Sequence, residues 1–301
     1  MTWSRGQRRK NDALFAVAKA GLHFGLTLPR AWLGGSGEGL GLAAYALLGG
    51  ARRATLANLA LARPDLDDVA RRRFARAVFR SLGRNLTDTL ALLDPHEDPA
   101  RTLDMSASSE RVLASALEHG RGVIYATGHI GPWERMAALL AKRGFPITTV
   151  ARESYDPRFH ALVYDKLRAR RKVEVIYRGD PGASVAIVRA LRRGRVLGLL
   201  MDMPGRIATR NVTWLGLPSR VPMGAARLAL RLGAPVVVGT PAPSTRGLEV
   251  RITAIETDDL AAGERGEAEL SQRIADALCE RIRLLPTHWP WMHPTFVSSS
   301  S

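Results

Sequence analysis

The fold of this chain is decided by residues 123–134, which read Val123-Ile124-Tyr125-Ala126-Thr127-Gly128-His129-Ile130-Gly131-Pro132-Trp133-Glu134. A short apolar run is followed by two glycines that flank a histidine, and a proline then introduces a helical segment. This order predicts a buried strand, a tight turn and the start of a helix, because proline fits the first helical position. In an open α/β sheet, functional side chains lie at the carboxyl ends of strands, which is where His129 falls.

The alternation of strands and helices continues on the carboxyl side of this stretch. Short apolar runs predict strands at 122–127, 147–151, 173–177, 196–201, 212–215, 235–239 and 248–255. Amphipathic segments predict helices at 133–143, 157–171, 182–193, 222–232 and 265–284. This alternation implies an α/β fold, an αβα sandwich with a largely parallel central sheet. We place this domain at residues 106–297, followed by a tail at 298–301 that is expected to be disordered.

Residues 1–105 are expected to form a separate, N-terminal helical region that associates with a membrane. Four basic residues at positions 5, 8, 9 and 10 precede a mostly apolar stretch at 13–28, which Lys19 interrupts. This pattern favours helices in a membrane interface, with the basic residues facing anionic headgroups. The alternative is ordinary helices that cover a soluble core. The glycine-rich run at 34–41 fits no nucleotide-binding motif and is expected to be a flexible turn.

A long amphipathic helix is predicted at 65–93. Large apolar residues recur at every fourth position from Phe74 to Leu90, which is the spacing of one helical face. Four arginines, including Arg76 and Arg80, form a second stripe with the same spacing. The simpler interpretation of this stripe is a helix face that is exposed to solvent. The functional alternative is a substrate-binding surface for phosphates or an acidic carrier protein.

Composition excludes several classes of protein. Hydrophobic residues make up 46% of the 301 residues and charged residues 24%, which is a globular composition. The single cysteine, Cys279, excludes an intramolecular disulfide framework and a multi-cysteine zinc site, and we expect it in the core. The 44 Lys and Arg exceed the 28 Asp and Glu by 16, which predicts an anionic partner. Nucleic acid is disfavoured as that partner, because the sequence has neither an aromatic stacking motif nor a helix-turn-helix signature.

His129 and Glu134 are the candidate catalytic pair. Glu134 lies five residues after His129, close enough across the turn to accept a proton from one imidazole nitrogen. A carboxylate in that position fixes the tautomer and makes the other nitrogen a better base. No serine or cysteine occupies an elbow motif nearby, so direct attack by a substrate hydroxyl is the simplest chemistry. A purely structural histidine is the alternative.

The spacing His129-x-x-x-x-Glu134 resembles the H-x-x-x-x-[D/E] signature of the lysophospholipid acyltransferase superfamily. Other segments resemble its bacterial branch, the lipid A biosynthesis acyltransferases, which includes the phosphatidylinositol mannoside acyltransferases. In chain order these segments are 58–64, 150–152, 201–202 with 214–218, 224–229, 233–237 and 288–293. Some positions depart from the family pattern, such as Met203-Pro204 and His288. These departures affect the predicted identity of the acceptor and not the predicted reaction.

The resemblance implies an acyltransferase that needs neither a cofactor nor a metal. His129 would act as the general base on an acceptor hydroxyl, and Glu134 would orient it. Arg152 is the candidate for stabilising the oxyanion, and Asp202 for positioning the acceptor or Arg152. Asp202 as a simple turn or helix cap is the alternative. The donor would be the thioester of acyl carrier protein or of CoA, both of which are acidic.

The acceptor implied is an anionic membrane glycolipid, most commonly a lipid A precursor of lipopolysaccharide biosynthesis at the cytoplasmic face of the inner membrane. A phosphatidylinositol mannoside-type or other glycolipid or amino-lipid acceptor, used with acyl-CoA, is the alternative. A non-catalytic, membrane-associated homologue is a further alternative. The presence of both His129 and Glu134 argues against it.

Overall fold

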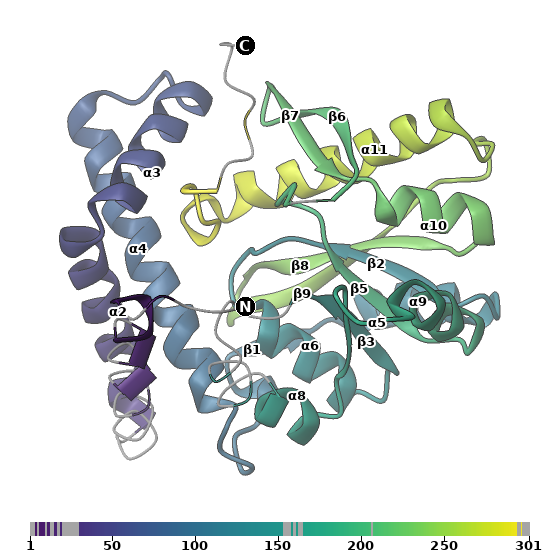
Figure 1. Ribbon diagram of the computed structural model, residues 1–301, viewed down its shortest axis with the longest axis horizontal. Helices are drawn as coiled ribbons and strands as arrows, with labels where there is room; N and C mark the ends of the chain where they lie inside the picture. Colours follow the sequence, from purple (N-terminus) through teal and green to yellow (C-terminus); the bar gives the residue numbers. More distant parts are fainter. Residues whose placement is uncertain are drawn as a thin grey trace.

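The computed structural model describes residues 4, 6–9, 11–12, 15–16, 19, 30–152, 158, 161, 165–205, 207–293 and 296 (Figure 1). The helices assigned among these residues are α2 (Arg30–Leu47), α3 (Gly49–Ala62), α4 (Asp68–Ala91), α5 (Ala107–Glu118), α6 (Trp133–Lys142), α8 (Lys166–Arg170), α9 (Ala183–Arg192), α10 (Gly224–Leu232) and α11 (Glu264–Leu284). The strands are β1 (Leu103–Met105), β2 (Val123–Thr127), β3 (Ile147–Ala151), β4 (Glu174–Tyr177), β5 (Val196–Leu200), β6 (Thr209–Trp214), β7 (Leu217–Pro222), β8 (Val236–Ser244) and β9 (Gly247–Ile255). Two single-turn helices are η1 (Pro99–Arg101) and η3 (Pro286–His288).

The central sheet has seven strands in the order β1-β9-β8-β2-β5-β3-β4. All neighbouring strands are parallel except β8 and β9, which form an antiparallel hairpin. The prediction of a largely parallel sheet is therefore confirmed. β1 pairs with β9, so the sheet begins before the domain boundary that the sequence placed at residue 106.

Strand β2 lies at the centre of the sheet and is buried along its whole length. Its side chains alternate between the two faces, as those of a strand covered on both sides must. Ile124 and Ala126 join the core under α9, α10 and α11, whereas Val123 and Tyr125 join the core under α5 and α6. Helices thus cover both faces (Figure 1), which confirms the αβα sandwich.

Most predicted elements are confirmed to within a few residues, and the exceptions are informative. The strand predicted at 212–215 belongs to the separate two-stranded hairpin of β6 and β7, not to the central sheet. The strands β1 and β7 and the helix α5 were not predicted. Of the helix predicted at 157–171, the structure describes α8 and little else, and the tail at 298–301 lies outside the described residues.

Helix α4 is the long helix predicted at 65–93. It begins where Asp67 accepts a hydrogen bond from the backbone N–H of Ala70 at 2.7 Å, a standard helix cap. Val78 is fully buried, but Leu86, expected on the same apolar stripe, is 52% exposed. A helix has 3.6 residues per turn, so a stripe of every fourth residue drifts around its surface and leaves the buried face.

The glycine-rich run at 34–41 is a helix and not the flexible turn that we expected. It lies in α2, which runs beside α4 at the left of Figure 1. A Cβ added to Gly41 would lie 2.0 Å from the carbonyl oxygen of Phe79, and one added to Gly83 would lie 2.0 Å from that of Gly37. The glycines therefore let the two helix backbones touch, because any side chain there would hold them apart.

No helix within the described part of the chain is both long and apolar enough to cross a membrane. The apolar stretch at 13–28, on which the expectation of membrane association rested, lies mostly outside the described residues. Association of the N-terminal region with a membrane interface stays a prediction.

Candidate active site

His129 follows β2 directly, at the carboxyl edge of the sheet. Two glycines shape the turn that presents it. Gly131 has a φ of 58°, a conformation that glycine adopts at little cost. A Cβ added to Gly128 would lie 3.3 Å from the carboxylate of Asp202, so glycine there permits the close approach of that side chain.

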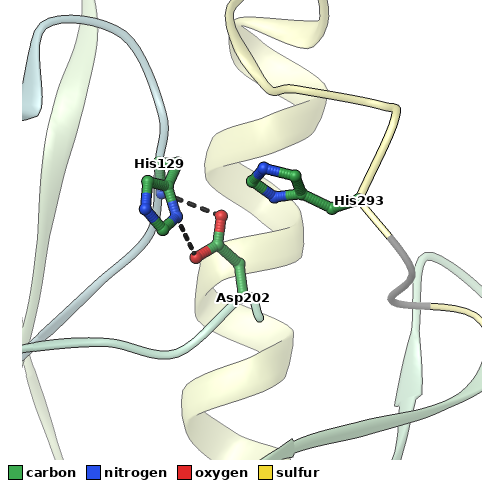
Figure 2. Close-up of side chains that lie close together, drawn as sticks. All are labelled: His129, Asp202 and His293. Atoms are coloured by element: carbon green, nitrogen blue, oxygen red, sulfur yellow. Dashed lines mark hydrogen bonds and ion pairs between the residues drawn. The ribbon is translucent and has the colours of Figure 1, made fainter. Parts of the chain in front are cut away.

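Asp202 is the hydrogen-bond partner of His129 (Figure 2). Its Oδ1 accepts from the ring Nδ1–H at 2.9 Å, and its Oδ2 accepts from the backbone N–H of His129 at 2.8 Å. The sheet register explains the contact: Thr127 of β2 lies opposite Leu200 of β5, so the residues two positions further on also lie side by side. The carboxylate fixes both the backbone and the tautomer of His129.

The pKa values of this pair follow from burial and from mutual charge. Burial lowers the pKa of His129, but the negative charge and hydrogen bond of Asp202, together with the charge of Glu134, raise it above its ordinary value. Burial acts to raise the pKa of Asp202, which has no exposed surface, but the charge and hydrogen bonds of His129, together with the charge of His293, lower it to about 2. Asp202 is therefore an anion at neutral pH, and it stabilises the imidazolium form of His129.

The C-terminal segment completes the site. The indole Nε1–H of Trp289 donates to Oδ2 of Asp202 at 3.0 Å, and Trp289 packs edge-on against Trp291. The ring of His293 stands edge-on to that of His129, with centroids 5.2 Å apart. Asn58 of α3 donates to the carbonyls of Trp291 and His293 at 2.7 and 2.9 Å, which ties this segment to the helical layer. The sequence did not predict the bond from Trp289 to Asp202.

Glu134 does not take the role that the sequence assigned to it. Its Oε1 accepts from Arg168 Nη2 of α8 at 2.7 Å, and both side chains are buried. The first turn of α6 directs the carboxylate toward α8, whereas the end of β5 places Asp202 beside the imidazole. The orientation of His129 by Glu134 is thus corrected to orientation by Asp202. Glu134 acts on His129 through its charge.

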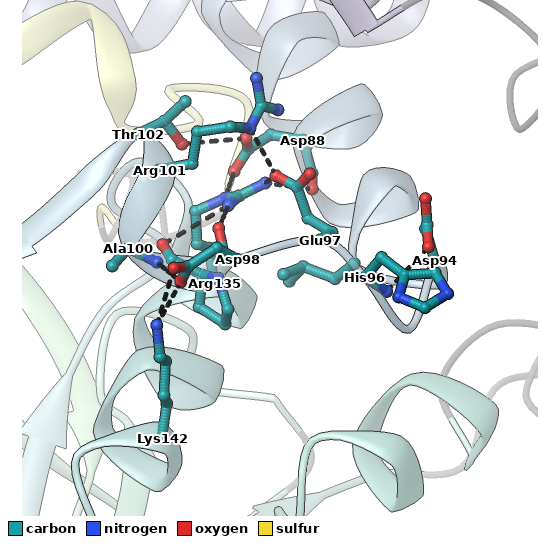
Figure 3. Close-up of polar contacts among 12 residues, drawn as sticks. Asp88, Asp94, His96, Glu97, Asp98, Ala100, Arg101, Thr102, Arg135 and Lys142 are labelled. Atoms are coloured by element: carbon teal, nitrogen blue, oxygen red, sulfur yellow. Dashed lines mark hydrogen bonds and ion pairs between the residues drawn. The ribbon is translucent and has the colours of Figure 1, made fainter.

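A buried ionic network fixes the start of α6 to α4 (Figure 3). Arg135, which has no exposed surface, donates to Asp88 of α4 at 2.6 Å and to Glu97 at 2.8 Å. Lys142 at the other end of α6 donates to Asp98 at 2.7 Å. Since Arg135 directly follows Glu134, the network couples the N-terminal helices to the helix that begins beside His129.

Three arginines were predicted from the sequence to bind substrate, and none of them takes part in the hydrogen bonds between His129 and Asp202. Arg152 follows β3 at the same edge of the sheet as His129, with β5 between the two strands, and its side chain is exposed. Arg76 stacks over the ring of Tyr45 at 5.6 Å. Arg80 donates to Glu38 of α2 at 2.9 Å, so its charge is already paired within the helical layer.

Among the described residues, a metal ion could be held by His129, Asp202 and His293, whose potential ligand atoms lie within 4.8 Å of one another. Figure 2 shows, however, that Nδ1 of His129 faces Asp202 while Nε2 points away from both other residues. A shared metal would have to replace the hydrogen bond between Nδ1 and the carboxylate. The arrangement fits a histidine base with a free Nε2 better than a metal site.

Comparison with known proteins shows the family of the chain. The family of the bacterial lipid A biosynthesis acyltransferases matches residues 9–298. The chain belongs to this family. A phosphatidylinositol mannoside acyltransferase of Mycobacterium tuberculosis (strain CDC 1551 / Oshkosh) is 26% identical over 209 residues, which are 68% of this chain and 64% of that protein. A protein of the same name from Mycolicibacterium smegmatis is 25% identical over 191 residues, 63% of this chain and 61% of that protein. The chain therefore spans less than two thirds of the length of these relatives.

Proposed function

We propose that this member of the family moves a fatty acyl group from a thioester to a hydroxyl of a membrane glycolipid, with His129 as the general base. The observation that carries the proposal is the hydrogen bond between His129 Nδ1 and Asp202, which leaves Nε2 as the acceptor for a proton. The same chemistry requires no residue of the chain to form a covalent intermediate.

The reaction balances with these two residues. Nε2 of His129 takes the proton of the acceptor hydroxyl while its oxygen attacks the thioester carbonyl carbon. Asp202 stabilises the imidazolium that forms. When the tetrahedral intermediate collapses, the carbon–sulfur bond breaks and the imidazolium returns the proton to the departing thiolate. The products are an ester and a free thiol.

We assign supporting roles to two further side chains. Arg152 lies at the same sheet edge as His129, which suits a cation that stabilises the oxyanion of the intermediate. Glu134 and Arg168 form a buried ion pair behind the catalytic histidine. We assign Glu134 an electrostatic role, in which its negative charge helps to stabilise the imidazolium.

The acceptor that we propose is a glycolipid of the phosphatidylinositol mannoside type, with acyl-CoA as donor. The names of the relatives above support this acceptor. A lipid A precursor with an acyl carrier protein donor is the second candidate, which the description of the family favours. The net charge of +16 suits either acidic donor and either anionic acceptor.

We further propose that the protein works at the cytoplasmic face of the inner membrane, with α2 lying in the interface. Large apolar side chains on α2 and at its junction with α3 support this. Trp32, near the start of α2, is 69% exposed. Leu47, at the end of α2, is 81% exposed, and the exposed Leu48 directly follows it. The exposed Arg53 follows in the first turns of α3, where it suits anionic headgroups.

The test is lipid mass spectrometry after incubation of the protein with vesicles that contain either candidate acceptor, and with palmitoyl-CoA or palmitoyl-acyl carrier protein. We expect one acceptor to gain one acyl unit with the unaltered protein and none with His129→Ala. Arg192→Gln, an exposed change at the end of α9, is the control and is expected to behave like the unaltered protein. Acylation of the lipid A precursor alone would replace the first candidate with the second, and turnover by His129→Ala would refute the mechanism.

A further inference from the structure

A cavity of about 680 Å³ lies between α4, the β8–β9 hairpin and the C-terminal segment. Its wall includes Pro132 and His288, so it adjoins the turn that carries His129. The backbone N–H of Gly131 donates to the carbonyl of His288 at 3.0 Å, and the next residue, Trp289, bonds to Asp202. Two wall residues, Pro132 and His288, are thus close in the chain to His129 and to the partner of Asp202, so the cavity lies next to the catalytic pair. A volume of this size accommodates a substrate headgroup.

The charged groups in the cavity wall are mostly cationic. Arg84 of α4, Arg101 of η1 and Arg246 of the β8–β9 turn all contribute to it. Among the described residues of the wall, Asp88 is the one carboxylate, and Arg135 already neutralises it through a 2.6 Å ion pair. Arg84 pairs with Glu38 and Arg101 with Glu97, so Arg246 is the wall cation with no ion pair among the described residues. Since the cations come from three separate segments, they surround the space. Such an arrangement suits an anion with several oxygens.

Two polar atoms in the wall have no partner among the described residues. Asn85 is only 6% exposed, and its Nδ2 makes no hydrogen bond. Nδ1 of His288 is also buried without a partner. Buried polar atoms of this kind cost stability unless a ligand or water satisfies them. Because burial and the charge of Arg84 lower the pKa of His288, its ring is neutral and can either donate or accept.

We propose that this cavity binds the phosphorylated headgroup of the acyl acceptor. Arg246 and Arg101 would bind its phosphate oxygens, and Asn85 would donate to a phosphate or sugar oxygen. The cavity also touches α2 at Gly34. A phospholipid and the phosphates of a soluble donor share this chemistry, and the titration distinguishes them. The inference rests on the proposed function, whose acceptor it describes more closely.

The test is calorimetric titration of the His129→Ala protein, in which we expect no turnover, with dihexanoyl phosphatidylinositol below its micellar concentration and separately with CoA. Arg246→Gln lies on an exposed turn and should leave the fold intact. We expect it to weaken binding of the lipid probe about tenfold, the scale of one lost charge-assisted hydrogen bond. Asn85→Asp should weaken it more than Asn85→Ala, because it adds a negative charge beside the phosphate. Arg192→Gln is the control and should bind unchanged.

Each outcome decides the assignment. Weaker binding of the lipid probe in Arg246→Gln and Asn85→Asp, with CoA unaffected, supports it. Weaker binding of CoA alone would overturn it in favour of a donor site, and equal binding by all variants would remove the cavity from substrate recognition. Because binding is measured without turnover, a failure here is distinguishable from a failure of the lipid mass spectrometry.

Discussion

Replacing Gly41 by alanine is expected to force α2 away from α4. The new Cβ would lie 2.0 Å from the carbonyl oxygen of Phe79 and 2.7 Å from its carbonyl carbon. A carbon and a carbonyl oxygen approach to about 3.3 Å at closest in ordinary contacts. The two backbones must therefore separate by more than about 1 Å, since neither atom belongs to a side chain that can rotate away.

The expected magnitude combines two opposing effects. Alanine favours a helix over glycine by about 1 kcal/mol, which acts to stabilise the variant. Overpacking of a tight contact costs about 1–3 kcal/mol, and the opened seam also loses its van der Waals contacts. We expect Gly41→Ala to lower the free energy of unfolding by about 1–2 kcal/mol. Gly39→Ala is the matched control, because a Cβ there meets nothing within 4 Å, and it should raise that energy by about 0.5–1 kcal/mol.

Urea unfolding of the two variants and the parent, followed by circular dichroism, measures these differences. Hydrogen exchange at the amides of α4 gives an independent reading if α2 separates before the rest of the protein unfolds. Equal stability of Gly41→Ala and Gly39→Ala would refute the close packing of α2 on α4. It would also remove the reason for treating α2 as part of the cavity wall.

Two further substitutions test the surroundings of the site. Glu134→Gln removes a charge that helps to raise the pKa of His129, so the acid limb of the pH–rate profile should move to lower pH. The loss of turnover should be smaller than the loss that Asp202→Asn causes. An acid limb that does not move would contradict the electrostatic role of Glu134. Arg135→Met leaves Asp88 and Glu97 without their buried partner and should cost about 3–5 kcal/mol in thermal or urea unfolding. Arg143→Met, on a partly exposed residue at the end of the same helix, should cost less than about 1 kcal/mol, and similar losses for both would argue against the network.

The sequence predicted the sandwich well because its strands are short apolar runs that are buried on both faces. The runs Val123–Thr127 and Val196–Leu200 leave no polar face to water, and such strands have few other places to lie. The helices between them carry clear amphipathic patterns. The prediction of a flexible turn at 34–41 was wrong. Helix propensity treats each glycine as unfavourable and contains no information about the backbone of a neighbouring helix.

The site was predicted in part. His129 was found from its glycines and its place after a strand, but its partner was not. Glu134 is near in sequence, whereas Asp202 becomes the partner only because β5 lies next to β2 in the sheet. Strand order is a property of the whole fold, and local spacing does not contain it. The bond from Trp289 to Asp202 was missed for the same reason, since 87 residues separate the two.

The most direct test of the central claim is the pH dependence of kcat/KM for the unaltered protein and for Asp202→Asn. For the unaltered protein, activity should rise with pH through a pKa above 6.5, because His129 must be deprotonated and Asp202 holds its pKa above the ordinary value. In Asp202→Asn the amide oxygen can still accept from Trp289 and from the backbone of His129, but its NH₂ faces Nδ1. The proton then moves to Nε2, which no longer serves as the base, and kcat/KM should fall about 10³–10⁴-fold. A loss of less than tenfold, with an unshifted profile, would contradict the account.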